Sequence, residues 1–266
     1  MELSSFQEKT EIAIDECKGS VKFCSKNALV HLRKAYKLIE FDAEMAVFRA
    51  ITAEEEAASS IFHMLKNQQY QHANKLNFKE HKYKQGLFPF VQSVILHMSE
   101  FNEWNNSPVS SVHLEHCTHN GRKAIQLHLE LQELGLCASP TPPLHFSFTD
   151  KESGQPITFN ETFKKTFQGN EFDSAVKYLK KLAVRRNEIL YASSSGLPKV
   201  SGNVKEFVDS QKNNVFKLLN LLLLCDPWIN EGRSAFVQQA LDAFLVLMDK
   251  ISASNMVQSP SGAANS

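Results

Sequence analysis

Long apolar runs are missing from this sequence. The longest, Leu218 to Cys225, is interrupted by Asn220 and is far shorter than the ~20 residues that a membrane-spanning helix requires. The stretch from Met1 to Thr10 is polar and lacks the cationic start and apolar segment of a secretory signal. The sequence therefore predicts neither a membrane span nor export, and it favours a soluble cytoplasmic protein.

Net charge and cysteine are also low. The chain has 29 Lys and Arg against 29 Asp and Glu, so no overall field draws it to nucleic acid, and polyanion binding must come from a local patch. The 5 cysteines are odd in number and scattered, which is typical of reduced thiols rather than of a disulfide framework.

Motifs for common cofactors and nucleophiles are absent. The sequence has no Gly-rich phosphate loop, no Gly-x-Ser-x-Gly elbow and no His-Glu-x-x-His motif, so no cofactor is predicted. A central group of His and Cys lacks the short Cys-x-x-Cys spacing that zinc sites often use. Its members are His113, His116, Cys117, His119 and His128. We interpret them as exposed strand residues and predict no metal; a metal enzyme built on these histidines is the alternative.

Apolar residues at three- and four-residue spacing predict a mainly α-helical chain. Asp42 offers an N-cap for a strong helix, and Pro89 is tolerated only in the first turn of a later one. The predicted helices are Glu2–Cys17, Lys26–Phe41, Met45–Leu65, Phe88–Phe101, Phe172–Tyr191, Val204–Cys225 and Ser234–Ile251. The remaining C-terminal residues are small and polar, and they are predicted to be disordered.

Between Ile125 and Leu131 the apolar period changes to two, which indicates a half-buried strand. The preceding dipeptide Asn120-Gly121 favours a two-residue hairpin, because both residues tolerate positive φ. Placing His119 opposite Arg122 sorts the strands into an apolar and a polar face. This register predicts the pairs Val112–Leu129, Leu114–Leu127, His113–His128 and Glu115–Gln126.

A second hairpin is predicted from Leu144–Thr149 and Ile157–Phe159, with its turn at Gly154. Four strands with a shared apolar face can pack on the helices. The predicted organisation is N-terminal helices over residues 1–104, a β insertion over 105–165, C-terminal helices over 166–251 and a disordered tail over 252–266.

Two charged residues fall on stripes that face the core. Glu55 lies at the centre of an apolar stripe, whereas Glu54 and Glu56 are predicted to point away from it. Arg186 lies within the apolar face of the helix that ends at Tyr191. A carboxylate on such a stripe needs a cation or several donors, and a guanidinium suits it. We predict a pair of Glu55 and Arg186, either as a structural ion pair or within a functional site.

Three short motifs carry a family resemblance. They are the acidic, alanine-rich stretch Phe48–Phe62 (FRAITAEEEAASSIF), the segment Arg186-Asn-Glu-Ile-Leu-Tyr191, and His81-Lys82-x-Lys84 before an apolar helix. They resemble, in turn, the second helix, the Arg-Asn-x-x-x-His signature and a basic element of the HEPN superfamily. These are helical domains of prokaryotic toxins, abortive-infection proteins and RNA-processing nucleases. The resemblance implies an antiparallel helical bundle that forms a homodimer.

The resemblance also implies roles for single residues. In active members of the family, Arg, Asn and His at a dimer cleft cut RNA without metal. Arg186 would then stabilise the scissile phosphate and Asn187 would orient the catalytic site. Tyr191 stands at the position of the His, and a phenol with a pKa of about 10 is a poor general base near neutrality, so weak or absent cleavage is expected. The predicted substrate-binding residues are Glu55, His81, Lys82 and Lys84.

Basic clusters flank the predicted site. One consists of Lys75, Lys79, Lys82 and Lys84, and the other of Lys164, Lys165, Lys177, Lys180, Lys181 and Arg185. Tyr83, Phe163 and Tyr178 lie among them as surfaces on which bases could stack. The alternative interpretation is a set of solvated helix faces.

The sequence thus predicts a mainly α protein: a HEPN-like antiparallel bundle with a small inserted antiparallel sheet of about four strands. The first functional hypothesis is an RNA-associated or defence-type protein, of the abortive-infection or toxin–antitoxin kind. The second is a noncatalytic module that binds a protein partner through the β insertion. The segment Leu218–Leu224 is apolar all round and suits either the core or a partner interface.

Overall fold

The computed structural model is mainly helical. It describes residues 1–104, 109, 111–131, 135–141, 143–145, 153–154, 200, 202–228 and 233–256. The helices in these ranges are α1 (Ser5–Asp15), α2 (Gly19–Leu38), α3 (Ala43–Asn67), α4 (His81–Trp104), α7 (Val204–Leu224) and α8 (Ala235–Met256), with a short 3-10 turn, η1, at Ala73–Lys75. The same ranges contain one three-stranded antiparallel sheet of β1 (Ser111–His119), β2 (Arg122–Leu131) and β3 (Leu136–Ala138), in that order.

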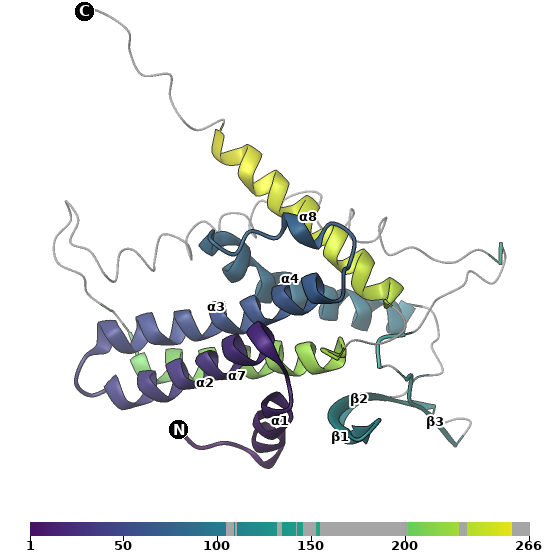
Figure 1. Ribbon diagram of the computed structural model, residues 1–266, viewed down its shortest axis with the longest axis horizontal. Helices are drawn as coiled ribbons and strands as arrows, with labels where there is room; N and C mark the ends of the chain where they lie inside the picture. The colour runs from purple at the N-terminus through teal and green to yellow at the C-terminus, as the bar shows by residue number, and fades with distance from the viewer. Residues whose placement is uncertain are drawn as a thin grey trace, which may run out of the picture.

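Helix α3 lies at the centre of the helical part. It packs against α2, α4 and α7, and Figure 1 shows α2 and α7 running alongside it. Ala53, Ala57 and Ala58 in its middle are fully buried, as is Phe62. Small side chains let the neighbouring helices approach closely on several sides of α3. A polar side chain in the middle of α3 therefore has to find its partners inside the protein.

The helices agree with the sequence prediction except at their ends. Asp42 is the N-cap of α3, and its Oδ1 accepts a hydrogen bond of 2.9 Å from the backbone N–H of Met45. Helix α4 begins at His81, so Pro89 lies inside it and not in its first turn as expected. Proline removes one backbone hydrogen bond there. Side-chain contacts from the first turns of α4 to α3, described below, offset that loss.

Some predictions fall outside the described residues. These are the helix Phe172–Tyr191, most of the second hairpin and the tail from residue 257. Helix α8 continues through Met256, so the first residues of the tail predicted to be disordered are helical. The structure adds β3, which the sequence did not predict, because three residues are too few to show a period of two.

The first hairpin is confirmed in its turn and its register. Asn120 and Gly121 have φ values of 48° and 73°, both positive as a type I′ turn requires. His119 pairs with Arg122, and all four predicted cross-strand pairs are formed. The rings of His113 and His128 stack, with centroids 5.2 Å apart.

One cluster of hydrogen bonds fastens the sheet to the helices. His116 Nε2 on β1 lies 3.2 Å from Thr10 Oγ1 and 3.0 Å from the carbonyl oxygen of Phe6, both in α1. The Thr10 hydroxyl also donates to Asn220 Oδ1 of α7, at 2.9 Å. Ile125 of β2 is fully buried in the same core. The β insertion is therefore packed on α1 and α7.

The apolar segment Leu218–Leu224 forms the end of helix α7. Leu218, Leu219 and Leu222 have no exposed surface and lie in the core, whereas Leu221 and Leu224 are partly buried and pack against it. Of the helices described, none combines the length and the apolar character needed to cross a membrane.

Candidate functional site

The predicted site residues divide into those that the structure describes and those that it does not. Arg186, Asn187 and Tyr191 lie outside the described residues, as does the second basic cluster. Of the predicted substrate-binding residues, Glu55, His81 and Lys84 come together between α3 and α4. The predicted pair of Glu55 and Arg186 stays a prediction.

Glu55 is the centre of this group, and only 2% of its surface is exposed. His81 Nδ1 lies 2.9 Å from Glu55 Oε2 and 3.0 Å from Oε1, so the ring faces both carboxylate oxygens. Lys84 Nζ lies 3.4 Å from Oε2. Gln85 Nε2 donates a hydrogen bond of 2.8 Å to Oε1. The desolvated carboxylate is compensated by several donors, as its burial requires.

The spacing on α4 explains how one carboxylate reaches three partners. Lys84 and Gln85 follow His81 by three and four residues, so both lie on the same face of the helix as His81. That face begins at the first residue of α4, where the helix dipole favours a negative charge. Gln85 Oε1 is buried and has no hydrogen-bond partner. The cluster therefore holds a polar atom that could accept a further donor.

Lys82 does not join this cluster. Its Nζ lies 2.7 Å from Glu80 Oε2 and donates a hydrogen bond of 3.1 Å to Ser252 Oγ on α8. One residue of displacement along α4 turns its side chain by about 100°, which directs it to a different neighbour. Lys75 and Lys79, from the same basic cluster, are exposed. Lys82 and Lys84 are thus partly buried, whereas Lys75 and Lys79 lie at the surface.

The position of Glu54 differs from the one predicted from the sequence. Glu54 was expected to point to solvent, but only 6% of its surface is exposed. Asn214 Nδ2 of α7 donates a hydrogen bond of 3.0 Å to Glu54 Oε2. Burial, with a smaller contribution from the Glu55 charge, raises the pKa of Glu54 to about 7, although hydrogen bonds from Asn214 and Gln211 oppose the shift.

The helical wheel failed at Glu54 because it assigns each helix one buried face. Helix α3 is covered on several sides, by α2, α4 and α7. The sequence held a signal of this, because the residues around the acidic run are mostly small: Ala50, Ala53, Ala57, Ala58, Ser59 and Ser60. A helix with small or apolar residues on all sides is typical of a buried helix.

The histidines of the hairpin form hydrogen bonds rather than a ligand set. His128 Nε2 lies 3.2 Å from Glu115 Oε2, and its Nδ1 lies 2.9 Å from Ser139 Oγ. Among the described residues, no group of three or more His, Cys, Asp or Glu is placed to hold a metal ion. The alternative of a metal enzyme therefore has no support in this part of the chain.

Comparison of the chain with protein-family models, with curated proteins and with solved structures found no match. The resemblance carried by the three short motifs thus stays a prediction. What the geometry adds is one buried carboxylate that gathers an imidazole and an ammonium group at the start of α4.

Proposed function

We propose that this chain is a HEPN-like, RNA-associated protein of the defence type, with weak or absent metal-independent nuclease activity. The observation that carries the proposal is the contact of buried Glu55 with His81 and Lys84. The acidic motif on α3 and the basic motif on α4 resemble the same family, and they meet in space. In this proposal the helices form a HEPN-like bundle, and the chain forms a homodimer.

The site proposed for RNA combines this cluster with Arg186, Asn187 and Tyr191. Glu55 orients His81 through Nδ1, which fixes the position of the ring. Lys84 and Arg186 would supply positive charge for a phosphate, and a guanidinium can bind two phosphate oxygens at once. Tyr191 can donate a hydrogen bond but is a poor base near neutrality, so we expect binding without efficient cleavage.

Binding to tRNA and to total RNA tests the proposal. We expect the purified protein to bind RNA with an affinity that falls as salt rises, because phosphate contacts release counterions. Arg186→Ala should weaken binding roughly tenfold. Tyr191→His should raise cleavage above that of the wild type, and Tyr191→Phe serves as the matched control. Equal RNA binding by wild type and Arg186→Ala, with no cleavage by any variant, would remove the proposal.

A noncatalytic module that binds a protein through the sheet is the second candidate. Val112 is 50% exposed and Leu136 is 59% exposed. The pairing register places both on the face that carries Leu129. Here Arg186→Ala should lower the melting temperature without affecting partner capture. Val112→Asp and Leu136→Asp, on this exposed apolar face, should abolish capture of the partner and leave the melting temperature unchanged.

A further inference from the structure

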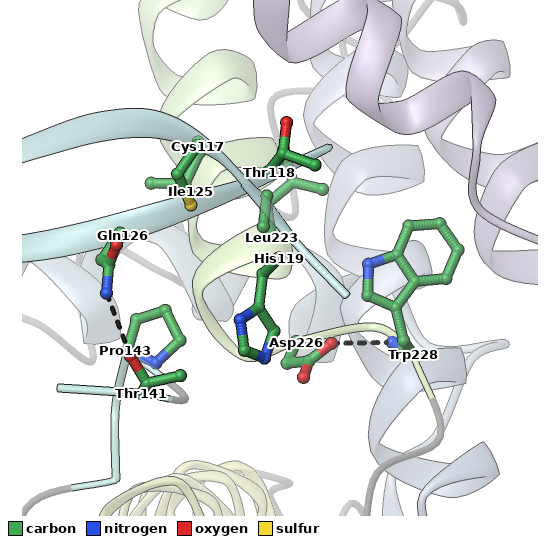
Figure 2. Close-up of a pocket in the computed structure, with 11 residues that line it drawn as sticks. Cys117, Thr118, His119, Ile125, Gln126, Thr141, Pro143, Leu223, Asp226 and Trp228 are labelled. Atoms are coloured by element: carbon green, nitrogen blue, oxygen red, sulfur yellow. Dashed lines mark hydrogen bonds between the residues drawn. The ribbon is translucent and has the colours of Figure 1, made fainter. Parts of the chain in front are cut away.

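A second candidate site lies away from Glu55, between the hairpin and the end of α7. The hollow is lined by Cys117, Thr118, His119, Ala124, Ile125, Gln126, Thr141, Pro143, Leu223, Asp226 and Trp228. Figure 2 shows these side chains around one space, with the hairpin on one side and the segment after α7 on the other. With its open mouth the hollow encloses about 430 Å³. The proposed function assigns nothing to it.

Trp228 supplies the first sign of a ligand. The residue is 8% exposed, and its indole Nε1 is buried without a hydrogen-bond partner. Figure 2 shows this nitrogen on the edge of the ring that faces His119 and Leu223. An unpaired buried donor is unfavourable, so most proteins pair such groups with protein atoms, water or a ligand.

The unpaired N–H is not the result of a loose side chain. The Arg122 guanidinium lies over the indole, with its central carbon 4.9 Å from the ring centroid. Gln68 Nε2 donates to the carbonyl oxygens of both Asp226 and Trp228, the latter at 3.2 Å. The indole is thus held in place by a charged side chain and an anchored backbone.

Asp226 supplies an acceptor to the same hollow. It adopts a left-handed backbone conformation, with φ of 54°, and its Oδ1 accepts the backbone N–H of Trp228 at 3.2 Å. This leaves Oδ2 as the oxygen that can accept from a ligand. Ile125, Leu223 and Pro143 supply apolar walls. The hollow therefore presents the buried N–H of Trp228 and an acceptor oxygen of Asp226 beside apolar walls, and its lining also includes the polar side chains of Thr118, His119, Gln126 and Thr141.

Size and charge restrict what fits. The enclosed part of the hollow is small, about 50 Å³, so it can take only one edge of a small ring. An anion would meet the Asp226 carboxylate, and an apolar group would leave the indole N–H unpaired. A planar group with an acceptor beside a donor satisfies both residues.

We propose that this hollow binds the edge of a single nucleobase. The Trp228 Nε1–H donates to a ring carbonyl or ring nitrogen, and Asp226 Oδ2 accepts from the neighbouring N–H. Ile125, Leu223 and Pro143 contact the part of the ring that enters the hollow, and the sugar stays at the mouth. Every common nucleobase carries an acceptor beside a donor on one edge, so each of the four can satisfy both residues. The hollow shares no lining residue with the cluster of Glu55, His81, Lys84 and Gln85.

Binding of uridine and of N3-methyluridine to the full-length chain tests the site. The readout is the indole N–H resonance of Trp228, observed in a Trp104→Phe background because the chain has 2 Trp. Uridine should shift this resonance. N3-methyluridine keeps the carbonyls but lacks the N–H, so it should bind at least about tenfold more weakly. Equal binding of the two, or no shift with any of the four common nucleosides, would overturn the proposal.

Two variants separate recognition from folding. Asp226→Asn suits the left-handed backbone and keeps an oxygen for the Trp228 N–H, but it replaces the second acceptor by a donor. We expect at least a tenfold loss of uridine binding with an unchanged melting temperature. Arg186→Ala should leave uridine binding unchanged, so failure of the proposed RNA function would not affect this result. If the loss in Asp226→Asn does not appear, the site is wrong.

The source of the base is decided by comparing uridine with a short oligouridylate. A strand that binds more tightly through the same Trp228 shift identifies a base within single-stranded RNA. Equal affinities identify a free nucleoside or nucleotide. Both results support the site.

Discussion

Helix α3 buries two neighbouring carboxylates, Glu54 and Glu55, in different surroundings on two of its sides. Glu55 faces the start of α4 and contacts His81 and Lys84, which are cationic or can become so. Glu54 faces α7, where the neutral amide of Asn214 donates a hydrogen bond to it. A neutral donor satisfies hydrogen bonding but cannot balance a charge in a medium of low dielectric constant.

This difference shows that burial alone does not decide how a carboxylate affects stability. On the α4 side, removing the carboxylate would leave cationic partners uncompensated. On the α7 side, the charge itself is the unfavourable element, since burial raises the pKa of Glu54 to about 7. Removing one charge should thus destabilise the protein and removing the other should stabilise it near neutral pH.

The largest effect is expected for Glu55→Ala. The change leaves the ammonium group of Lys84, whose side chain is 13% exposed, without its carboxylate, and it leaves Gln85 without an acceptor. We expect a loss of about 3–5 kcal/mol in the free energy of unfolding, measured by denaturant titration. Glu56→Ala removes the same charge from the same helix at a partly exposed position and is the matched control. A loss of less than about 1 kcal/mol in Glu55→Ala would contradict the role of the cluster.

Glu54→Gln should act in the opposite direction. The carboxyl binds its proton more tightly in the folded chain than at its ordinary pKa of 4.5, so its stabilising contribution is present below about pH 4.5 and is lost as pH rises through about 7. The neutral amide removes this dependence. We expect the variant to exceed the wild type by as much as about 3 kcal/mol at pH 8 and to match it near pH 4. If the free energies of unfolding of the two proteins differ by the same amount at every pH between 4 and 8, the raised pKa of Glu54 is refuted.

Asn214→Leu should give the smallest of these effects. It removes a hydrogen bond that favours ionised Glu54, so we expect a loss of about 2 kcal/mol at pH 8 and a further rise in the pKa of Glu54. Carboxyl resonances followed across the pH range would report the pKa directly. Asn213→Leu changes an exposed neighbour on the same helix and should have little effect. Equal losses in the two variants would argue against the contact between α3 and α7.

How far the sequence predicted the structure depends on how local each feature is. The register of the hairpin follows from the alternation in β2 and from Asn120-Gly121, both of which act over a few residues. The centre of α3 was likewise visible as a stripe that includes Glu55. Both predictions are confirmed in the described part of the chain.

Features set by three-dimensional neighbours were not predicted. The burial of Glu54 depends on α7, which is about 160 residues away in the chain. The early start of α4 depends on contacts with Glu55 that no local pattern contains. Pro89 was assigned to a first turn for the same reason, because the residues before it look polar when they are considered without α3.

The hydrogen bonds around Thr10 join helix α1 to strand β1. They connect α1 to the strand that supplies Cys117, Thr118 and His119 to one wall of the hollow beside Trp228. A ligand in that hollow and an intact α1 should consequently favour each other, by the reciprocity that governs all coupled equilibria. Hydrogen exchange in the first sixteen residues would then slow on addition of a nucleoside, although that segment never touches it.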